Sequence, residues 1–252
     1  MTGSRESVLQ EIANLLLDAR RTGKTLADLP IGYQPADLTE ITYVQDLVAA
    51  AFGPVGGYKI GAPSLEATPA FAPMPAAWIA PGGSKLATGR YRGVEAEIAF
   101  LVGRDLQPRA TPYSRDEVLD AMASCHPAIE VLESAFTVPN LPTPGAQADL
   151  QTHGGFLYGA PFTNWRSADF STEHIVLSID GVVRVERTGS NTSGDLLRLL
   201  RYLANEGAAR TGGLKAGQWI TTGSWTGLAL ATAGSTVDAE FSTAGRVELF
   251  FA

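Results

Sequence analysis

Apolar residues at helical spacing predict two amphipathic helices at the start of the chain. Over residues 7–22 they recur every three or four positions, at Leu9, Ile12, Leu15 and Leu16. Gly23 is the kind of residue that ends such a helix. A second stripe over about residues 37–51 predicts another helix, which the run Gly53-Pro-Val-Gly-Gly ends. We therefore expect residues 1–55 to form a helical segment that packs on the remainder of the chain.

Beyond residue 55, alternation of apolar and polar positions predicts a region rich in strands. Strands are expected at residues 58–61, 93–102, 126–133, 154–159, 219–222, 228–232, 236–241 and 246–251. Asp180-Gly181 joins two further strands, 175–179 and 182–187, in a hairpin. Helices are expected at about 114–124 and 195–206. Short turns between consecutive strands favour an antiparallel or mixed sheet. We expect one structural domain in which residues 56–252 form the β core.

Two Pro-rich segments interrupt the strand pattern. Residues 63–81 contain Phe71, Met74 and Trp78 and are too apolar for a free linker, so we expect an ordered loop that packs on the domain. Residues 137–148 are expected to form a second loop.

The predicted strand over residues 93–102 carries a distinctive pair of charges. Alternation places Glu95 and Glu97 on one face, followed by Ala99 and Leu101. Because this face ends in apolar residues, we expect it to be covered, with both carboxylates at the mouth of a pocket. Their Cα atoms would lie roughly 6.6 Å apart, and a shared proton or a cation would relieve the repulsion between them. A solvated strand end is the alternative interpretation.

Two further charged residues stand among apolar neighbours. In the predicted strand 126–133, Glu130 alternates with buried positions, and a buried Glu needs a partner. Lys59 stands between Tyr58 and Ile60. A Lys in this setting lies either at the surface or partly desolvated, and desolvation would lower its pKa into a range suited to acid–base catalysis.

Composition and charge narrow the classes of function. The 252 residues carry 26 Asp and Glu against 19 Lys and Arg, and this formal charge of −7 argues against a nucleic-acid surface. No stretch reaches the roughly 18 apolar residues of a membrane span, and the first residues lack the apolar core of a signal peptide. Cys125 is the single cysteine, so we expect no internal disulfide and a cytoplasmic location. The three histidines form no zinc pattern, so carboxylates would bind any metal.

Several motifs, in order along the chain, resemble one known family. They are Tyr58-Lys59-Ile-Gly61, Gly-Val-Glu95-Ala-Glu97-Ile-Ala, Pro127-Ala-Ile-Glu130-Val, the run from Asp149 to Pro161, and Ala216-Gly-Gln-Trp-Ile-Thr-Thr222-Gly223. From about residue 37 onward, the chain resembles the 2-keto-4-pentenoate hydratase family of the fumarylacetoacetate hydrolase superfamily. This family also contains 2-oxohept-4-ene-dioate hydratases and 4-oxalocrotonate decarboxylases. The resemblance implies an α+β fold, with a mixed β-roll core of the fumarylacetoacetate hydrolase C-terminal-domain type and with peripheral and N-terminal helices.

The resemblance also implies a metal site and a reaction. Glu95, Glu97 and Glu130 would be the ligands of one Mg²⁺ or Mn²⁺, and hard cations prefer oxygen ligands. A 2-oxo acid would chelate this cation, which would act as a Lewis acid. The implied activity is that of a lyase that adds water to a 2-hydroxy-2,4-dienoate and yields a 4-hydroxy-2-oxo acid.

Further residues receive roles by the same resemblance. Lys59 would transfer a proton or hold the substrate carboxylate. Asp149 and Thr152 would be catalytic residues from the family's Asp-Asn-Ala-Ser run. Thr222 and Gly223 would line the substrate site with hydroxyl and backbone donors.

Some positions depart from the family pattern. Ala77 stands where the family has an Asp, so one proposed acid–base group is missing. Leu150 replaces the Asn that follows the Asp of the family run. His153 lies beside this run and is interpreted as structural rather than as a substitute proton carrier. No His precedes His126, which favours hydration or decarboxylation over C–C hydrolysis.

Two other functions stay open at this point. One is decarboxylation of 2-oxo-3-hexenedioate, for which Arg90 and Arg92 either bind the second carboxylate or lie at the surface. The other is a catalytically weakened partner subunit that keeps the fold and the metal, motivated by Ala77 and Leu150. The resemblance further implies a small 2-oxo or 2-hydroxydienoic acid as substrate, a homo-oligomer, and association with a related enzyme of the same pathway.

Overall fold

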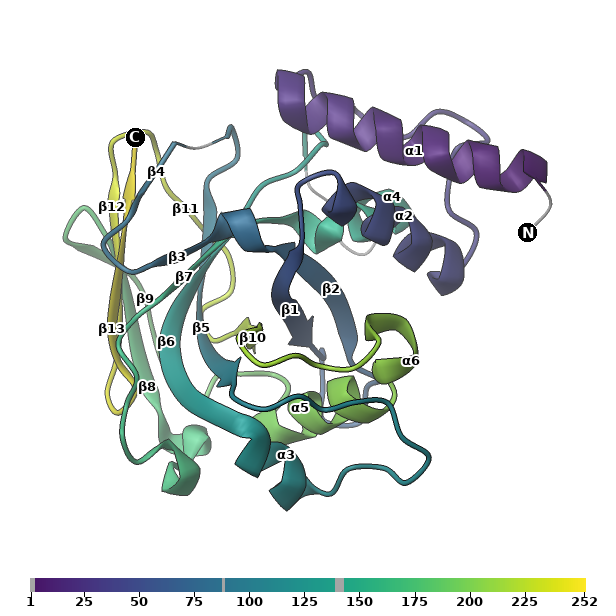
Figure 1. The fold of residues 1–252 in the computed structure, drawn as a ribbon. Helices are drawn as coiled ribbons and strands as arrows, with labels where there is room; N and C mark the ends of the chain where they lie inside the picture. The colour runs from purple at the N-terminus through teal and green to yellow at the C-terminus, as the bar shows by residue number, and fades with distance from the viewer. Residues whose placement is uncertain (1–2, 88, 139–142) are drawn as a thin grey trace.

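A curved sheet of eight strands forms the centre of the fold (Figure 1). The computed structural model describes residues 3–87, 89–138 and 143–252. Seven strands follow the order β2-β1-β10-β5-β6-β7-β3, and β11 pairs with β5. Their bounds are β1 Val55–Gly61, β2 Ala70–Pro75, β3 Ile79–Pro81, β5 Gly93–Val102, β6 Met122–Leu132, β7 His153–Tyr158, β10 Trp219–Ser224 and β11 Ala229–Leu230. The pairs β1/β10 and β3/β7 are parallel and β5/β6 is antiparallel, so the sheet is mixed.

A second sheet of five strands packs against the first, at the left of Figure 1. Its order is β4-β13-β12-β8-β9. The strands are β4 Lys85–Leu86, β8 His174–Ile179, β9 Val182–Thr188, β12 Thr236–Phe241 and β13 Gly245–Phe251. Every second residue of β8 is buried, and these residues join the same apolar cluster as Ile98 and Phe100 of β5. The cluster between the two sheets is therefore a shared core.

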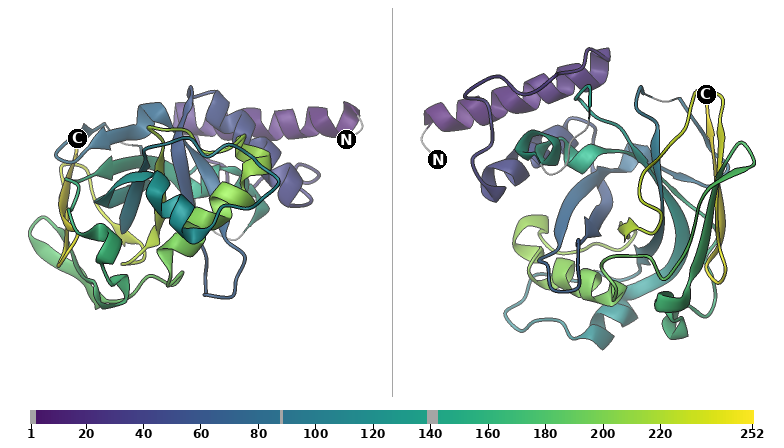
Figure 2. Two further views of the ribbon diagram at one scale, coloured as in Figure 1. Left: turned by 60° about the horizontal axis from the view of Figure 1, so that its bottom comes forward. Right: turned by 180° about the vertical axis from the view of Figure 1, so that it is seen from behind.

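The helices form two groups on the sheets, as the further views in Figure 2 also show. One group contains α1 Gly3–Thr22, α2 Leu38–Ala50 and α4 Pro144–Ala148. The other contains α3 Arg115–Ala121, α5 Leu196–Asn205 and α6 Ala208–Thr211. Four short 3₁₀ turns complete the description: η1 Ala76–Trp78, η2 Leu150–Thr152, η3 Trp165–Ser167 and η4 Phe170–Thr172. Within the described ranges, none of the helices combines the length and the apolar character that a membrane span requires.

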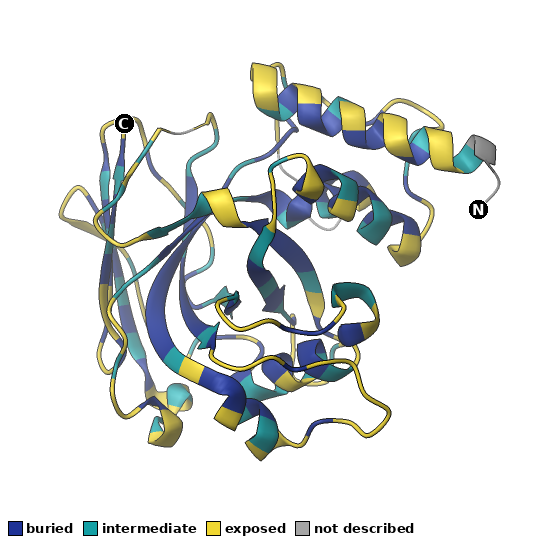
Figure 3. Ribbon diagram, viewed as in Figure 1, coloured by how far each residue is buried: buried dark blue, intermediate teal, exposed yellow. Residues whose placement is uncertain are grey.

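The N-terminal helices have an apolar cluster of their own. Leu9, Ile12 and Leu16 of α1 are fully buried against Val44 and Val48 of α2. Figure 3 shows the result: α1 turns one buried side toward the molecule and one exposed side outward. Burial of each such side chain stabilises the fold by about 1.5–3 kcal/mol, so this helix is firmly held.

Most predicted elements are confirmed, and the differences have local causes. The predicted loop over 63–81 contains β2, η1 and β3, because its Pro and Ala residues pair with neighbouring strands without an alternating pattern. The predicted strand over 228–232 shortens to β11, and the predicted helix over 114–124 ends at Ala121, where β6 follows directly. In the predicted loop over 137–148, Thr143 caps α4, while residues 139–142 lie outside the described part.

Candidate functional site

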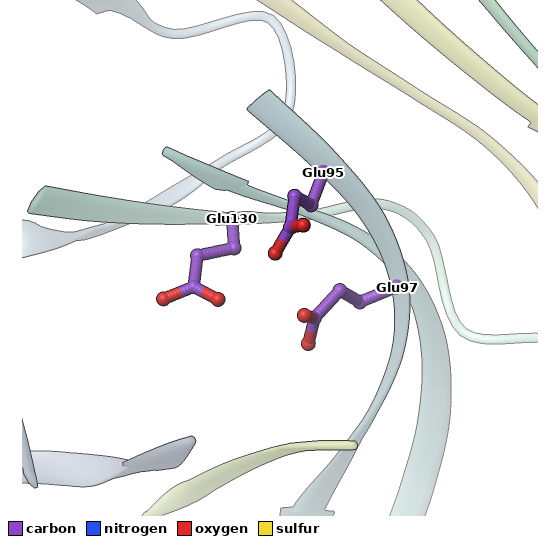
Figure 4. Close-up of side chains that lie close together, drawn as sticks. All are labelled: Glu95, Glu97 and Glu130. Carbon is purple, nitrogen blue, oxygen red and sulfur yellow. The ribbon is translucent and has the colours of Figure 1, made fainter. Parts of the chain in front are cut away.

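Three glutamates converge where β5 and β6 pair (Figure 4). Glu95 lies directly opposite Glu130 across the antiparallel ladder, and Glu97 follows on the same face of β5. Each residue offers a carboxylate oxygen, and these oxygens lie within 4.8 Å of one another. The period-two alternation of both strands explains the convergence, because it directs all three side chains to one side of the sheet.

Apolar residues cover the rest of this face. Ala99, Ala128, Phe156, Met74 and Trp219 form a buried cluster beside the glutamates. The expectation that the far end of β5 is covered on both faces is therefore confirmed, and the alternative of a solvated strand end is wrong. Glu97 is 1% exposed and Glu130 is fully buried.

Burial and mutual repulsion act on the carboxylates. Burial raises the pKa of Glu97 well above its usual range, and the charges of Glu130 and Glu95 raise it further. Burial and the charge of Glu130 also raise the pKa of Glu95. Burial opposes ionisation of Glu130, but Lys59 and His153 outweigh it and lower the pKa of that carboxyl. The cluster thus favours a positive partner beyond those the chain supplies.

Lys59 reaches the cluster from β1, which lies in the same sheet and is separated from β5 by β10. Its Nζ lies 2.7 Å from Glu130 Oε1 and donates to the carbonyl oxygen of Gln151 at 3.1 Å. Burial alone would lower the pKa of Lys59, but the charge and hydrogen bond of Glu130 outweigh it and raise that pKa. The predicted lowering of this pKa is therefore wrong, because the sequence pattern does not reveal the carboxylate across the sheet.

His153, at the start of β7, contacts the same glutamate. Its Nδ1 lies 2.8 Å from Glu130 Oε1, and the side chain is fully buried. Burial lowers the pKa of His153, so the neutral ring donates this hydrogen bond through Nδ1–H. The geometry agrees with a structural His that orients a carboxylate.

The second carboxylate oxygen of Glu130 indicates whether the site could bind a cation. Both Lys59 and His153 contact Oε1, whereas Oε2 is buried and has no hydrogen-bond partner in the described part of the chain. A buried oxygen of this kind is costly unless something binds it. Three convergent carboxylates are the donor set that Mg²⁺ or Mn²⁺ prefers, so Glu95, Glu97 and Glu130 could hold such an ion.

Residues of β10 complete the site, and one of them, Thr221, is not among the residues predicted from the sequence. The hydroxyl of Thr221 donates to Glu97 Oε2, and the Gly223 N–H donates to the same oxygen at 3.1 Å. Thr222 faces the other way and donates to the carbonyl oxygen of Ile98 at 2.7 Å. Alternation of sides along a strand could have identified Thr221, because Thr221 pairs with Ala99, which lies on the glutamate face.

The two residues predicted from the Asp-Asn-Ala-Ser run lie outside the glutamate cavity. Asp149 is fully buried and forms an ion pair with Arg20 of α1, whose Nε lies 2.5 Å from Asp149 Oδ1. Thr152 is buried and donates to the carbonyl oxygen of Gln151 at 2.6 Å. Gln151, between them, lines the cavity. Their predicted roles as catalytic residues remain untested, and this geometry favours roles in holding the turn.

The cavity at the glutamates has a volume of about 520 Å³. Besides the glutamates and Lys59, its walls include Gly61, Pro63, Gln151, Thr192, Ser193 and Gly223. Among the described residues that line it, Lys59 is the only cationic side chain. The cavity can therefore hold a small anion beside a carboxylate-bound cation.

Four other residues discussed above do not line the glutamate cavity. Two are departures from the family pattern, and two are arginines considered for binding a second carboxylate. Arg90 donates to the carbonyl oxygens of Ser134 and Phe136. Arg92 and Ala77 line a separate cavity of about 250 Å³. Leu150 packs in the cluster of the N-terminal helices. Ala77 is therefore not among the described residues that line the glutamate cavity.

Comparison with known proteins gives relatives of two activities. No family model matches the chain. A 4-oxalocrotonate decarboxylase from a Pseudomonas species is 30% identical over 173 residues, which cover 68% of this chain and 65% of that protein. The aligned part thus spans less than two thirds of that relative. A 2-keto-4-pentenoate hydratase from Dechloromonas aromatica is 25% identical over 253 residues, 95% of each chain.

A solved structure matches over nearly the whole length. It is a 4-oxalocrotonate decarboxylase from Pseudomonas putida G7 complexed with calcium and acetate, with a TM-score of 0.82, 22% identity, and 98% of both chains covered. This likeness establishes the fold as the mixed β-roll with peripheral helices. By sequence, the chain is similar to 4-oxalocrotonate decarboxylases and 2-keto-4-pentenoate hydratases, and it shares the fold of the former.

Proposed function

We propose that the protein is a divalent-metal-dependent lyase that adds water to a 2-hydroxy-2,4-dienoate and yields a 4-hydroxy-2-oxo acid. The observation that carries the proposal is the convergence of Glu95, Glu97 and Glu130 beside Lys59 in one cavity. Relatives named as hydratases and as a decarboxylase support a reaction of this group.

The metal and the chain have separate tasks in this proposal. An Mg²⁺ or Mn²⁺ held by the three glutamates would supply Lewis acidity toward the carboxylate and the C2 oxygen of the substrate. The raised pKa keeps Lys59 an ammonium at neutral pH, so it can donate a proton or hold a carboxylate in the cavity. The Gly223 N–H and the Thr221 hydroxyl fix the Glu97 carboxylate in place.

The overall reaction balances in two stages. The enol loses its hydroxyl proton while C5 gains one, which gives a 2-oxo-3-enoate. Water then adds across the C3–C4 double bond, with the hydroxyl at C4 and the hydrogen at C3. Lys59 is the proposed proton carrier for one of these transfers, because it is a cationic residue that lines the cavity.

The charge of the cavity favours hydration of a monocarboxylate over decarboxylation of a dicarboxylate. A second carboxylate would need a cation, and the described lining offers Lys59 alone. Arg90, a candidate for this role from the sequence, is engaged with two backbone carbonyls, and Arg92 lines the other cavity. Decarboxylation is therefore the second candidate, supported by the name of one relative.

Ultraviolet absorbance of 2-hydroxypenta-2,4-dienoate tests the proposal. The purified protein is expected to remove the diene band in Mg²⁺ and to leave it unchanged in excess chelator. Lys59→Met is expected to slow turnover by roughly a hundredfold while retaining Mg²⁺ binding, because general acid–base groups contribute factors of about 10²–10⁴.

Other results would favour decarboxylation, a partner subunit, or a mechanism without Lys59. Release of CO₂ from 2-oxo-3-hexenedioate without loss of the diene band would replace hydration by decarboxylation. Failure with both substrates, followed by activity only after addition of a related enzyme, would favour the partner subunit. Full turnover by Lys59→Met would remove Lys59 from the mechanism.

A further inference from the structure

The turn before β7 has an unusual backbone. Leu150, Gln151 and Thr152 are all in the left-handed region, with φ angles of 51°, 51° and 62°. For residues with a side chain this conformation costs free energy, and three in succession persist only where the surroundings hold them. The contacts of this turn therefore show which residues hold its backbone in place.

A buried ion pair holds the turn from one side. Arg20, near the C-terminal end of α1, has a side chain that is 5% exposed, and its partner Asp149 immediately precedes the turn. Besides the 2.5 Å contact between Nε and Asp149 Oδ1, Arg20 Nη2 donates to the carbonyl oxygens of Asp149 and Glu133 at 3.1 and 3.2 Å. Asp149 Oδ2 accepts from the Ala135 N–H at 2.7 Å. The pair thus joins α1, the segment that follows β6, and the turn.

The other side of the turn faces the glutamate cavity. The carbonyl oxygen of Gln151 accepts the hydrogen bond of Lys59 Nζ at 3.1 Å. The residue after the turn is His153, which donates to Glu130 Oε1. The same short segment therefore supplies one partner of Lys59 and one partner of Glu130.

We propose that Arg20 and Asp149 are positioning residues, which fix the left-handed turn 150–152 and through it the place of the Lys59 amine beside Glu130. The inference rests on the proposed function for the task of Lys59 and goes beyond it by giving α1 a part in the site. It also gives Asp149 a role other than proton transfer, since both of its carboxylate oxygens are used.

A second ion pair on the same helix provides a matched control. Arg5 of α1 donates to Glu40 of α2 through Nε and Nη2 at 2.7 and 2.5 Å. This pair joins the helices to each other and contacts neither the turn nor the glutamates. If Arg20 only held α1 on the fold, Arg20→Gln would resemble Arg5→Gln in its exchange at residues 150–153 and in its kcat.

The experiment measures hydrogen exchange and steady-state kinetics on the full chain for both variants. In Arg20→Gln, amide exchange at residues 150–153 is expected to accelerate by about tenfold or more, because hydrogen bonds to charged groups shift local equilibria by such factors. Its kcat is expected to fall by roughly ten- to a hundredfold with a smaller change in KM, as for a displaced catalytic group. Arg5→Gln is expected to change neither quantity.

Equal exchange at residues 150–153 in the two variants, together with equal kcat, would overturn the proposal. If Arg20→Gln does not fold, Asp149→Asn keeps the shape of the side chain and is expected to give the same pattern more weakly; wild-type exchange and kcat in that variant would overturn the proposal equally. If the wild-type protein has no turnover, the proposed function fails, while the exchange comparison still decides whether the pair fixes the turn.

Discussion

The carboxylate of Glu97 is buried and receives hydrogen bonds from uncharged groups, Thr221 and the Gly223 N–H. Its pKa is raised by burial and then by the neighbouring Glu130 and Glu95. A raised carboxyl pKa means that the folded state binds the proton more tightly than the unfolded state. At pH values above the ordinary Glu pKa, the carboxyl of Glu97 therefore destabilises the metal-free fold.

Glu97→Gln is accordingly expected to stabilise the protein in the presence of a chelator. Removal of the buried charge should raise the free energy of unfolding by about 1–2 kcal/mol, and the variant should lose the stabilisation that Mg²⁺ gives the wild type. Urea unfolding with chelator and with Mg²⁺ measures both effects.

Glu117→Gln is the control for this substitution. Glu117 is a partly exposed capping residue, and its hydrogen bond with Arg109 lowers its pKa, so its replacement should not stabilise the fold. A Glu97→Gln variant that is less stable than the wild type in chelator would contradict the account of repulsion.

Single residues also show what a sequence can and cannot predict about a site. Alternation along one strand predicts that Glu95 and Glu97 share a face, and the resemblance adds Glu130 to the set. The pairing of β5 with β6 brings the three together. The resemblance predicts a catalytic role for Asp149, but its contact with Arg20, 129 positions earlier, is one that no local pattern reveals. The register between β10 and β5 decides that the hydroxyl of Thr221, and not that of Thr222, faces the glutamates, and the sequence alone does not reveal this register.

Among the elements, the pair of α1 and α2 depends on an ion pair as well as on apolar packing. Ala36 N–H donates to Glu40 Oε2 at 2.6 Å, and Arg5 holds both oxygens of this carboxylate. The hydrogen bond of Arg5 outweighs burial and lowers the pKa of Glu40 to about 2. The depressed pKa means that the folded state favours the ionised form.

Glu40→Gln should therefore destabilise the protein in a pH-dependent way. Near neutral pH the loss is expected to be on the order of 2 kcal/mol, less than the full shift implies because Arg5 is partly exposed. The difference from the wild type should shrink as pH falls from about 4.5, the ordinary Glu pKa, toward about 2. Unfolding in urea at several pH values measures it, and a constant difference between about pH 7 and pH 3 would contradict this assignment.

The elements that the sequence predicted best are those in which apolar residues recur at regular intervals. Helices α1, α2 and α5 and the strands β5, β8 and β12 follow their apolar patterns closely. The segment over 63–81 was predicted as a loop, since β2 and β3 are short, Pro-containing strands whose pairing depends on β1 and β7. Such strands owe their conformation to neighbours distant in sequence.

The whole molecule carries a formal charge of −7, and its cavity contains three carboxylates against one ammonium. An anionic substrate would meet unfavourable charge in that cavity unless a divalent cation were bound first. The proposed function therefore depends on a metal at the glutamates. The resemblance predicted this ligand set, whereas the buried network of Lys59, His153, Gln151 and Arg20 required the folded chain.

Calorimetric titration of the metal-free protein with Mn²⁺ tests this central claim most directly. We expect one ion per chain in the wild type and loss of this binding in Glu95→Gln, whose half-buried side chain can be changed with little effect on packing. Lys59→Met should retain the binding. No binding by the wild type, or unchanged binding by Glu95→Gln, would contradict the three-glutamate site and the metal-dependent lyase proposed from it.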